Sequence, residues 1–145
     1  MIAAQDTTVV STTQLHPLGT RAYDPNGNEY VYVVGVTNGI LGAVANYDEA
    51  GVTTLVGNTT IGPVCVFMAI LAANTYGWGQ IWGKATVKTT ESVDDDDLAY
   101  TTATVGAVSD TSGGSFVRVE HMVFRAACSG ATTVKAQISY PTTNM

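Results

Sequence analysis

Charged residues are scarce in this sequence, and positively charged ones are scarcest. Asp, Glu, Lys and Arg make up 12% of the 145 residues, about half the usual share for a soluble globular protein. Six Lys and Arg stand against twelve Asp and Glu, for a formal net charge of -6, and none of the six precedes Arg21. Nucleic-acid phosphates and anionic membranes are bound by clustered positive side chains. Neither is therefore an expected partner.

Long apolar runs are missing as well. The longest, residues 64–73, is too short to cross a bilayer as a helix. The N-terminus has neither a positively charged segment nor an apolar one, so we expect no secretory signal and synthesis in a reducing cytoplasm. Of the two cysteines, Cys65 and Cys128, neither belongs to a zinc or redox motif. We expect two buried thiols, since a reducing compartment disfavours the alternative, a Cys65–Cys128 disulfide.

Catalytic and cofactor motifs are equally absent. The two histidines, His16 and His121, are far apart in the sequence and belong to no ligand pattern. Neither a Gly-x-Ser-x-Gly elbow nor a phosphate-binding glycine loop occurs. The acidic run from Asp94 to Asp97 is the one candidate for an ion site, but it lacks the spacing of a calcium loop, and a solvated acidic loop is the competing interpretation. We expect no enzyme activity, no cofactor and no metal site.

The residues that are abundant favour β-structure. Thr is typical of strands, and Gly, Asn and Ser are typical of turns. About seven to nine short strands separated by turn residues suit a small antiparallel β-sandwich or barrel, jelly-roll-like. We predict an extended N-terminal arm, residues 1–17, and one β domain, residues 18–145. The arm is polar, and it is either a frayed end or a segment that orders on a neighbouring chain.

Strand positions follow from the turn signals. A hairpin is predicted from residues 18–23 and 29–36, joined by the Asp-Pro-Asn-Gly-Asn turn. The run 64–73 is a buried strand or a short buried helix, and strand is favoured. The remaining predicted strands are residues 53–56, 76–88, 98–108, 116–127 and 132–140, the last ended by Pro141.

Two aromatic faces stand out. Trp78, Gln80 and Trp82 share one face of the predicted strand 76–88, and the opposite face is rich in glycine, which lets another segment approach closely. Tyr30 and Tyr32 share a face of the strand 29–36. Neither side of that strand is charged, so we expect protein to cover both. Core packing is the default for large aromatics, and the low overall charge supports a subunit interface as the alternative.

The order of these segments resembles the small decoration, or cement, proteins of tailed-bacteriophage capsids. The similarity is carried by Tyr-Gly-Trp-Gly-Gln-Ile-Trp-Gly at 76–83 and by the hairpin from Leu-Gly-Thr at 18–20 to Glu-Tyr-Val-Tyr at 29–32. It implies a non-enzymatic virion protein on the outer capsid surface that cements neighbouring major capsid subunits. It also implies an oligomer, for which we favour a trimer over a dimer. The candidate interface residues are Val9, Val10, Leu15, Tyr30, Tyr32, Trp78, Gln80 and Trp82.

Two other functions stay open. A carbohydrate- or receptor-binding β module would need exposed aromatic side chains beside polar ones, and Gln80 between the tryptophans is the hint of that. A small hydrolase would depend on one of the two histidines, and nothing in the sequence nominates its substrate.

Overall fold

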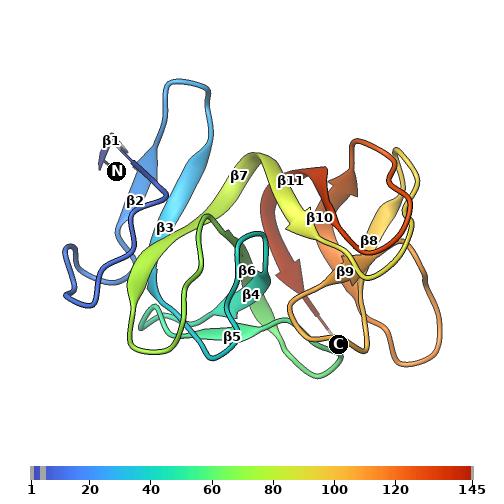
Figure 1. Ribbon diagram of the computed structural model, residues 1–145, viewed down its shortest axis with the longest axis horizontal. Coiled ribbons are helices and arrows are strands. Elements are labelled where there is room, and N and C mark those ends of the chain that lie inside the picture. The colour runs from blue at the N-terminus through green and yellow to red at the C-terminus, as the bar shows by residue number, and fades with distance from the viewer. Residues whose placement is uncertain (1, 4–5, 145) are drawn as a thin grey trace.

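The described part of the chain folds into strands, turns and loops (Figure 1). The computed structural model describes residues 2–3 and 6–144, and within them no helix is long and apolar enough to cross a membrane. The strands are β1 (Ile2–Ala3), β2 (Arg21–Tyr23), β3 (Glu29–Val34), β4 (Val44–Tyr47), β5 (Thr53–Leu55), β6 (Gly62–Phe67), β7 (Tyr76–Lys88), β8 (Leu98–Thr101), β9 (Val108–Ser109), β10 (Arg118–Phe124) and β11 (Thr133–Thr143). The predicted all-β class is confirmed.

The strands form one sheet, almost wholly antiparallel. Its order is β1-β2-β3-β7-β6-β11-β10-β8-β9, and β4 pairs with both β5 and β6. Among the strands of the described residues, β1 and β2 form the one parallel pair. The sheet folds over itself without closing, so it is sandwich-like and the barrel alternative is wrong.

The long strand β7 connects the two halves of the molecule (Figure 1). Its first half pairs with β3, in a register that sets Tyr32 opposite Trp78, and its second half pairs with β11. Side chains on one face of β7 therefore have different neighbours in its two halves. This difference in neighbours decides which of Trp78 and Trp82 is buried.

Two apolar clusters fill the inside of the folded sheet. The larger lies under β7, β11 and β10 and includes Val87, Ala136 and Phe124, all inward-facing positions of their strands. The smaller lies between β3, β6 and β7 and includes Val33 and Phe67. Alternate residues of β10 and β11 are exposed, so the period-2 pattern of these strands defines an inner and an outer face.

The glycines of β7 bring the small cluster close to the strand, as the sequence predicts. A β-carbon on Gly77 would stand 2.5 Å from Leu71 Cδ2, and one on Gly79 would stand 2.5 Å from Cys65 Sγ. Neither position has room for a side chain. Leu71 and Cys65 occupy that space instead.

The predicted hairpin is present, and Asp24 organises its turn. The Asp24 carboxylate accepts hydrogen bonds from the backbone N–H groups of Asn26 (2.9 Å) and Asn28 (3.1 Å). Gly27 has a φ of 84°, a conformation that glycine adopts without strain. These bonds fix the pairing of Tyr23 with Glu29.

Three strand predictions need correction. Strand β6 ends at Phe67, and the rest of the apolar run turns back so that Leu71 enters the core. The predicted strand 98–108 is interrupted between β8 and β9. Pro141 does not end the last strand: β11 continues to Thr143, because the pairing with β10 shifts around Pro141 and requires no N–H from it.

The two cysteines are free thiols, and no disulfide joins them. Cys65 is fully buried beneath Gly79, as predicted. Cys128 is only half-buried, which corrects the expectation, because it lies in a loop after β10 where it pairs with Val93 at the end of the molecule.

Candidate binding surfaces

The N-terminal segment packs on its own chain. β1 pairs with β2, and Ser11 exchanges two backbone hydrogen bonds with Tyr76 at the start of β7, of 3.1 and 2.8 Å. Residues 6–17 therefore lie along the β3–β7 part of the sheet, and a frayed end does not describe them. Their contacts cover the side chains of Tyr32 on β3 and Trp78 on β7.

An aromatic cluster holds this segment in place. The His16 ring lies 5.0 Å from that of Tyr32 and 5.4 Å from that of Trp78, between ring centroids. Tyr32 and Trp78 are themselves 5.0 Å apart, edge to face, a favourable arrangement for aromatic pairs. The backbone N–H of Leu15 donates to the Tyr32 hydroxyl at 3.1 Å. We call the contact of His16 and Leu15 with Tyr32 and Trp78 the arm latch.

Four of the eight candidate interface residues are thus buried inside the chain. Tyr32 and Trp78 lie under the arm latch, and Tyr30 and Gln80 lie beside them. Gln80 donates to the carbonyl of Trp82 (3.0 Å) and to the Asn28 side chain (3.2 Å). For these four residues the core interpretation applies, and both faces of β3 are covered by this chain itself.

Tyr30 and Asp24 perturb each other. The Tyr30 hydroxyl donates to the Asp24 carboxylate at 2.6 Å. Burial, together with this carboxylate, raises the pKa of Tyr30. Partial burial would by itself raise the pKa of Asp24, but the hydrogen bonds from Tyr30, Asn28 and Asn26 outweigh it and lower that pKa. The pair joins the turn to the aromatic cluster.

The other candidates of the arm are exposed. Val9, Val10 and Leu15 all lie at the surface, and Leu15 has 56% of its area accessible. We call these three residues the arm patch. Two of them border a hollow of about 370 Å³, whose lining residues are Ile2, Ala3, Asp6, Val9, Leu15, His16, Tyr32 and Trp78. Apolar side chains around a concave floor are typical of a contact surface.

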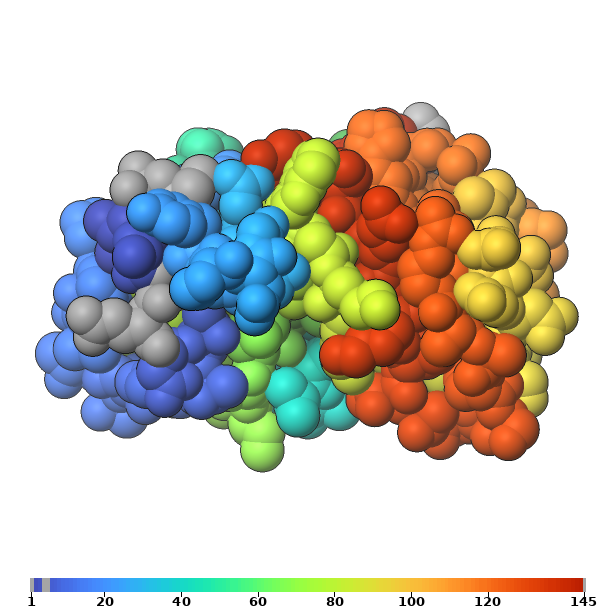
Figure 2. All heavy atoms as spheres, turned by 90° about the horizontal axis from the view of Figure 1, so that it is seen from above, coloured from blue at the N-terminus to red at the C-terminus, as the bar shows by residue number. Residues whose placement is uncertain are grey.

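A second surface lies on the outer face of the sheet. Figure 2 shows the yellow-green β7, the red β11 and the orange β10 side by side across the molecule. Trp82 of β7 and Tyr140 of β11 are 40% and 49% exposed, and their ring centroids are 5.0 Å apart with an interplanar angle of 49°. They border the outer-face hollow, of about 380 Å³, whose lining residues are Trp82, His121, Val123, Arg125, Gln137, Ser139 and Tyr140.

An irregularity in the β10–β11 pair shapes this hollow. His121 and Tyr140 both have a positive φ, of 62° and 50°, which few residues other than glycine adopt. The register shifts between Glu120 and Met122, and such bulges redirect side chains. The Tyr140 hydroxyl donates to the Glu29 carboxylate, and this bond raises the pKa of Tyr140.

The sequence nominated Trp82 but not Tyr140 or His121. The residues next to Tyr140 in the sequence do not predict its conformation, because that conformation occurs where the pairing of β11 with β10 is irregular. The structure does not bring the two histidines together: His16 belongs to the arm latch, and His121 lines the outer-face hollow.

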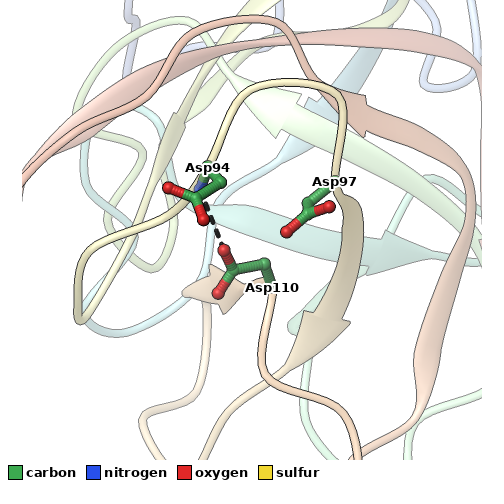
Figure 3. A group of neighbouring side chains, drawn as sticks. All are labelled: Asp94, Asp97 and Asp110. Atoms are coloured by element: carbon green, nitrogen blue, oxygen red, sulfur yellow. Dashed lines mark hydrogen bonds between the residues drawn. The ribbon is translucent and has the colours of Figure 1, made fainter.

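The acidic run divides between two environments. Asp96 forms an ion pair with Arg125, whereas Asp94 and Asp97 approach Asp110, which follows β9 (Figure 3). Carboxylate oxygens of these three lie within 4.8 Å of one another, and Asp110 accepts a hydrogen bond from the Asp94 backbone N–H at 2.9 Å. Asp94 and Asp97 are exposed, so water screens the group. The cluster is an acidic surface, and we assign no ion to it.

Comparison with known proteins gives one structural likeness. No family model matches the sequence, and no curated protein is similar to it in sequence. The fold is similar to that of a chain in the capsid of Myoviridae Phage XM1, with a TM-score of 0.56 and 17% sequence identity. The alignment covers 94% of this chain and 99% of that chain. The two chains therefore share a fold over nearly their whole lengths.

Proposed function

We propose that this protein is a structural component of a tailed-bacteriophage virion that binds the outside of the capsid and cements neighbouring major capsid subunits. The observation that carries the proposal is the fold shared with a chain of the Phage XM1 capsid, over 94% of one chain and 99% of the other. A likeness of that extent concerns the whole architecture and not a common fragment. The resemblance of residues 76–83 and of the hairpin to cement proteins supports the same function.

In this proposal the protein acts by binding and carries out no catalytic step. A capsid under pressure from packaged DNA fails where its subunits separate. A protein that binds only the assembled arrangement stabilises it by mass action. Contacts to two or more subunits act together, so assembled neighbours are bound more tightly than single subunits.

The arm patch is our candidate for the contact with the shell. Its side chains are apolar and exposed, and the Ser11–Tyr76 backbone bonds and the arm latch attach the segment to the sheet. A preordered contact surface loses less conformational entropy on binding than a mobile tail does. The expected partners are the major capsid protein and further copies of this chain, as a trimer in preference to a dimer. Both would be met on the outer surface of the virion, after synthesis in the host cytoplasm.

Co-sedimentation with capsids tests the contact. Capsids of the encoding phage are first stripped of this protein. Purified protein is then added over a concentration series, and the fraction that sediments with the capsids is measured. We expect saturable binding, which Val10→Asp with Leu15→Asp weakens at least tenfold. The matched control is Val105→Asp, at another exposed valine, on the loop between β8 and β9. Absence of wild-type binding would refute the function, and equal binding of all variants would refute the arm patch as its site.

A further inference from the structure

The outer-face hollow contains the one pair of exposed aromatic rings in contact among the described residues. The ring centroids of Trp82 and Tyr140 are 5.0 Å apart, and their planes are inclined by 49°. The two rings are therefore not stacked face to face, and part of each ring surface is accessible. The other tryptophan, Trp78, is 6% exposed. Large rings are normally buried in the core or at contacts. Two exposed aromatic rings in contact with each other indicate a ligand that stacks on aromatic side chains.

The backbone departs from regular geometry to build this angle. His121 and Tyr140 occupy left-handed conformations within paired strands, at neighbouring places of the β10–β11 ladder. Such conformations persist where the surrounding structure imposes them, and they are concentrated at functional sites. The bond from the Tyr140 hydroxyl to Glu29 then fixes the ring. The outlier conformations and the exposed rings meet at Tyr140, and both belong to the same hollow.

Polar groups line the rest of the hollow. Asp96 pairs with the Arg125 guanidinium, and Arg125 Nε donates to Gln137 Oε1 at 3.1 Å. With its oxygen accepting this bond, the Gln137 amide retains two N–H donors. Ser139 and His121 add a hydroxyl and an imidazole to the lining. The hollow thus combines aromatic walls with hydrogen-bond donors and acceptors.

We propose that the outer-face hollow is a binding site for a neutral pyranose sugar. A pyranose ring has an apolar face of C–H groups, which stacks on an aromatic ring, and a rim of hydroxyls, which exchange hydrogen bonds with amide, hydroxyl and guanidinium groups. The cavity volume of about 380 Å³ is within the range of small-ligand sites. Arg125, the one Lys or Arg among the lining residues, forms an ion pair with Asp96, so a neutral ligand suits the hollow better than an acidic one. The proposal is independent of the capsid role.

Saturation-transfer NMR on the full chain tests the site. The probes are the methyl pyranosides of glucose, galactose, mannose and N-acetylglucosamine, and their disaccharides. We expect transfer to at least one probe, strongest at the C–H protons of one ring face. Trp82→Ala should reduce the signal at least fivefold. Gln137→Leu changes only an exposed side chain and should reduce it similarly in a protein that keeps its unfolding midpoint.

Tyr23→Ala is the matched control. It removes an exposed tyrosine of β2 that does not line the hollow, and it should leave the transfer unchanged. The proposal is overturned if no probe receives saturation, or if Gln137→Leu and Trp82→Ala both bind like the wild type. Neither outcome affects capsid binding, which is measured separately.

Discussion

Gly79 lies directly against Cys65, so close that a β-carbon on Gly79 would stand 2.5 Å from the Cys65 sulfur and 2.7 Å from its Cβ. The contact joins the centre of β7 to β6 and belongs to the smaller apolar cluster. Both atoms of Cys65 are fixed by the core, so neither can move aside as a flexible side-chain end could. The contact explains why β7 carries glycine at this position.

Gly79→Ala should therefore destabilise the protein. Forcing a methyl group into a packed core typically costs about 1 to 3 kcal/mol, and we expect a loss of that order in the free energy of unfolding, measured by urea denaturation. Gly57→Ala is the control, because a β-carbon there would meet only Val105, a surface side chain, at 3.4 Å. Equal stability of the two variants would show that β6 and β7 are less tightly packed than described.

The two thiols should react differently. Burial raises the pKa of Cys65 to about 12, and its side chain is inaccessible, whereas Cys128 is half-buried. Only a thiolate reacts quickly with a disulfide reagent. We expect one thiol per chain to react with Ellman's reagent at pH 8 in the native protein, and two after unfolding in guanidinium chloride. Two fast native thiols, or none in the unfolded protein, would contradict the structure.

Asp24 should contribute stability that depends on pH. Its pKa is lowered in the folded state from an ordinary value of 3.8, so its contribution is complete above that value and is lost as the pH falls through the folded pKa. Asp24→Ala should cost about 1 kcal/mol at pH 7, since the carboxylate bonds hold the turn but are largely solvated.

The difference in unfolding free energy between wild type and Asp24→Ala should shrink below about pH 3.8. A difference that is the same at pH 3 and pH 7 would mean that the Asp24 charge plays no part in the turn.

The arm latch should depend on the Tyr32 hydroxyl. Tyr32→Phe keeps the ring packing with His16 and Trp78 but removes the acceptor of the Leu15 N–H. A hydrogen bond of this kind contributes about 0.5 to 1.5 kcal/mol. We expect faster hydrogen exchange at the amides of residues 11–16, with exchange in β10 and β11 unchanged. Unchanged exchange in the arm would show that ring packing alone holds it.

Local signals explain what the sequence could predict of the fold. The turn at residues 24–28 and strand β3 follow from neighbouring residues, because Asp24 and Gly27 encode the turn and alternating Tyr and Val encode the strand. The extent of β11 could not be predicted in this way. A proline normally ends a strand. Strand β11 continues past Pro141 because its pairing with β10, more than fifteen residues away in the chain, shifts at that point.

The candidate sites show the same division. Trp78 and Trp82 share a face of β7, and nothing in the sequence tells them apart. Trp78 is buried because His16 of the arm packs against it. Trp82 is exposed because the arm does not reach the part of β7 that pairs with β11. Tyr140 lines the outer-face hollow in a left-handed backbone conformation, next to the register shift of the β10–β11 pair. Both outcomes are set by contacts between distant segments.

Capsid stability is the most direct test of cementing. Under the proposed function, capsids of the phage that encodes this protein are stripped of it and heated with and without saturating amounts of it. The temperature of DNA release is followed with a DNA-binding dye. We predict that the wild-type protein raises this temperature by several degrees and that Val10→Asp with Leu15→Asp raises it less. A release temperature that stays the same at saturating, bound protein would contradict the cementing role.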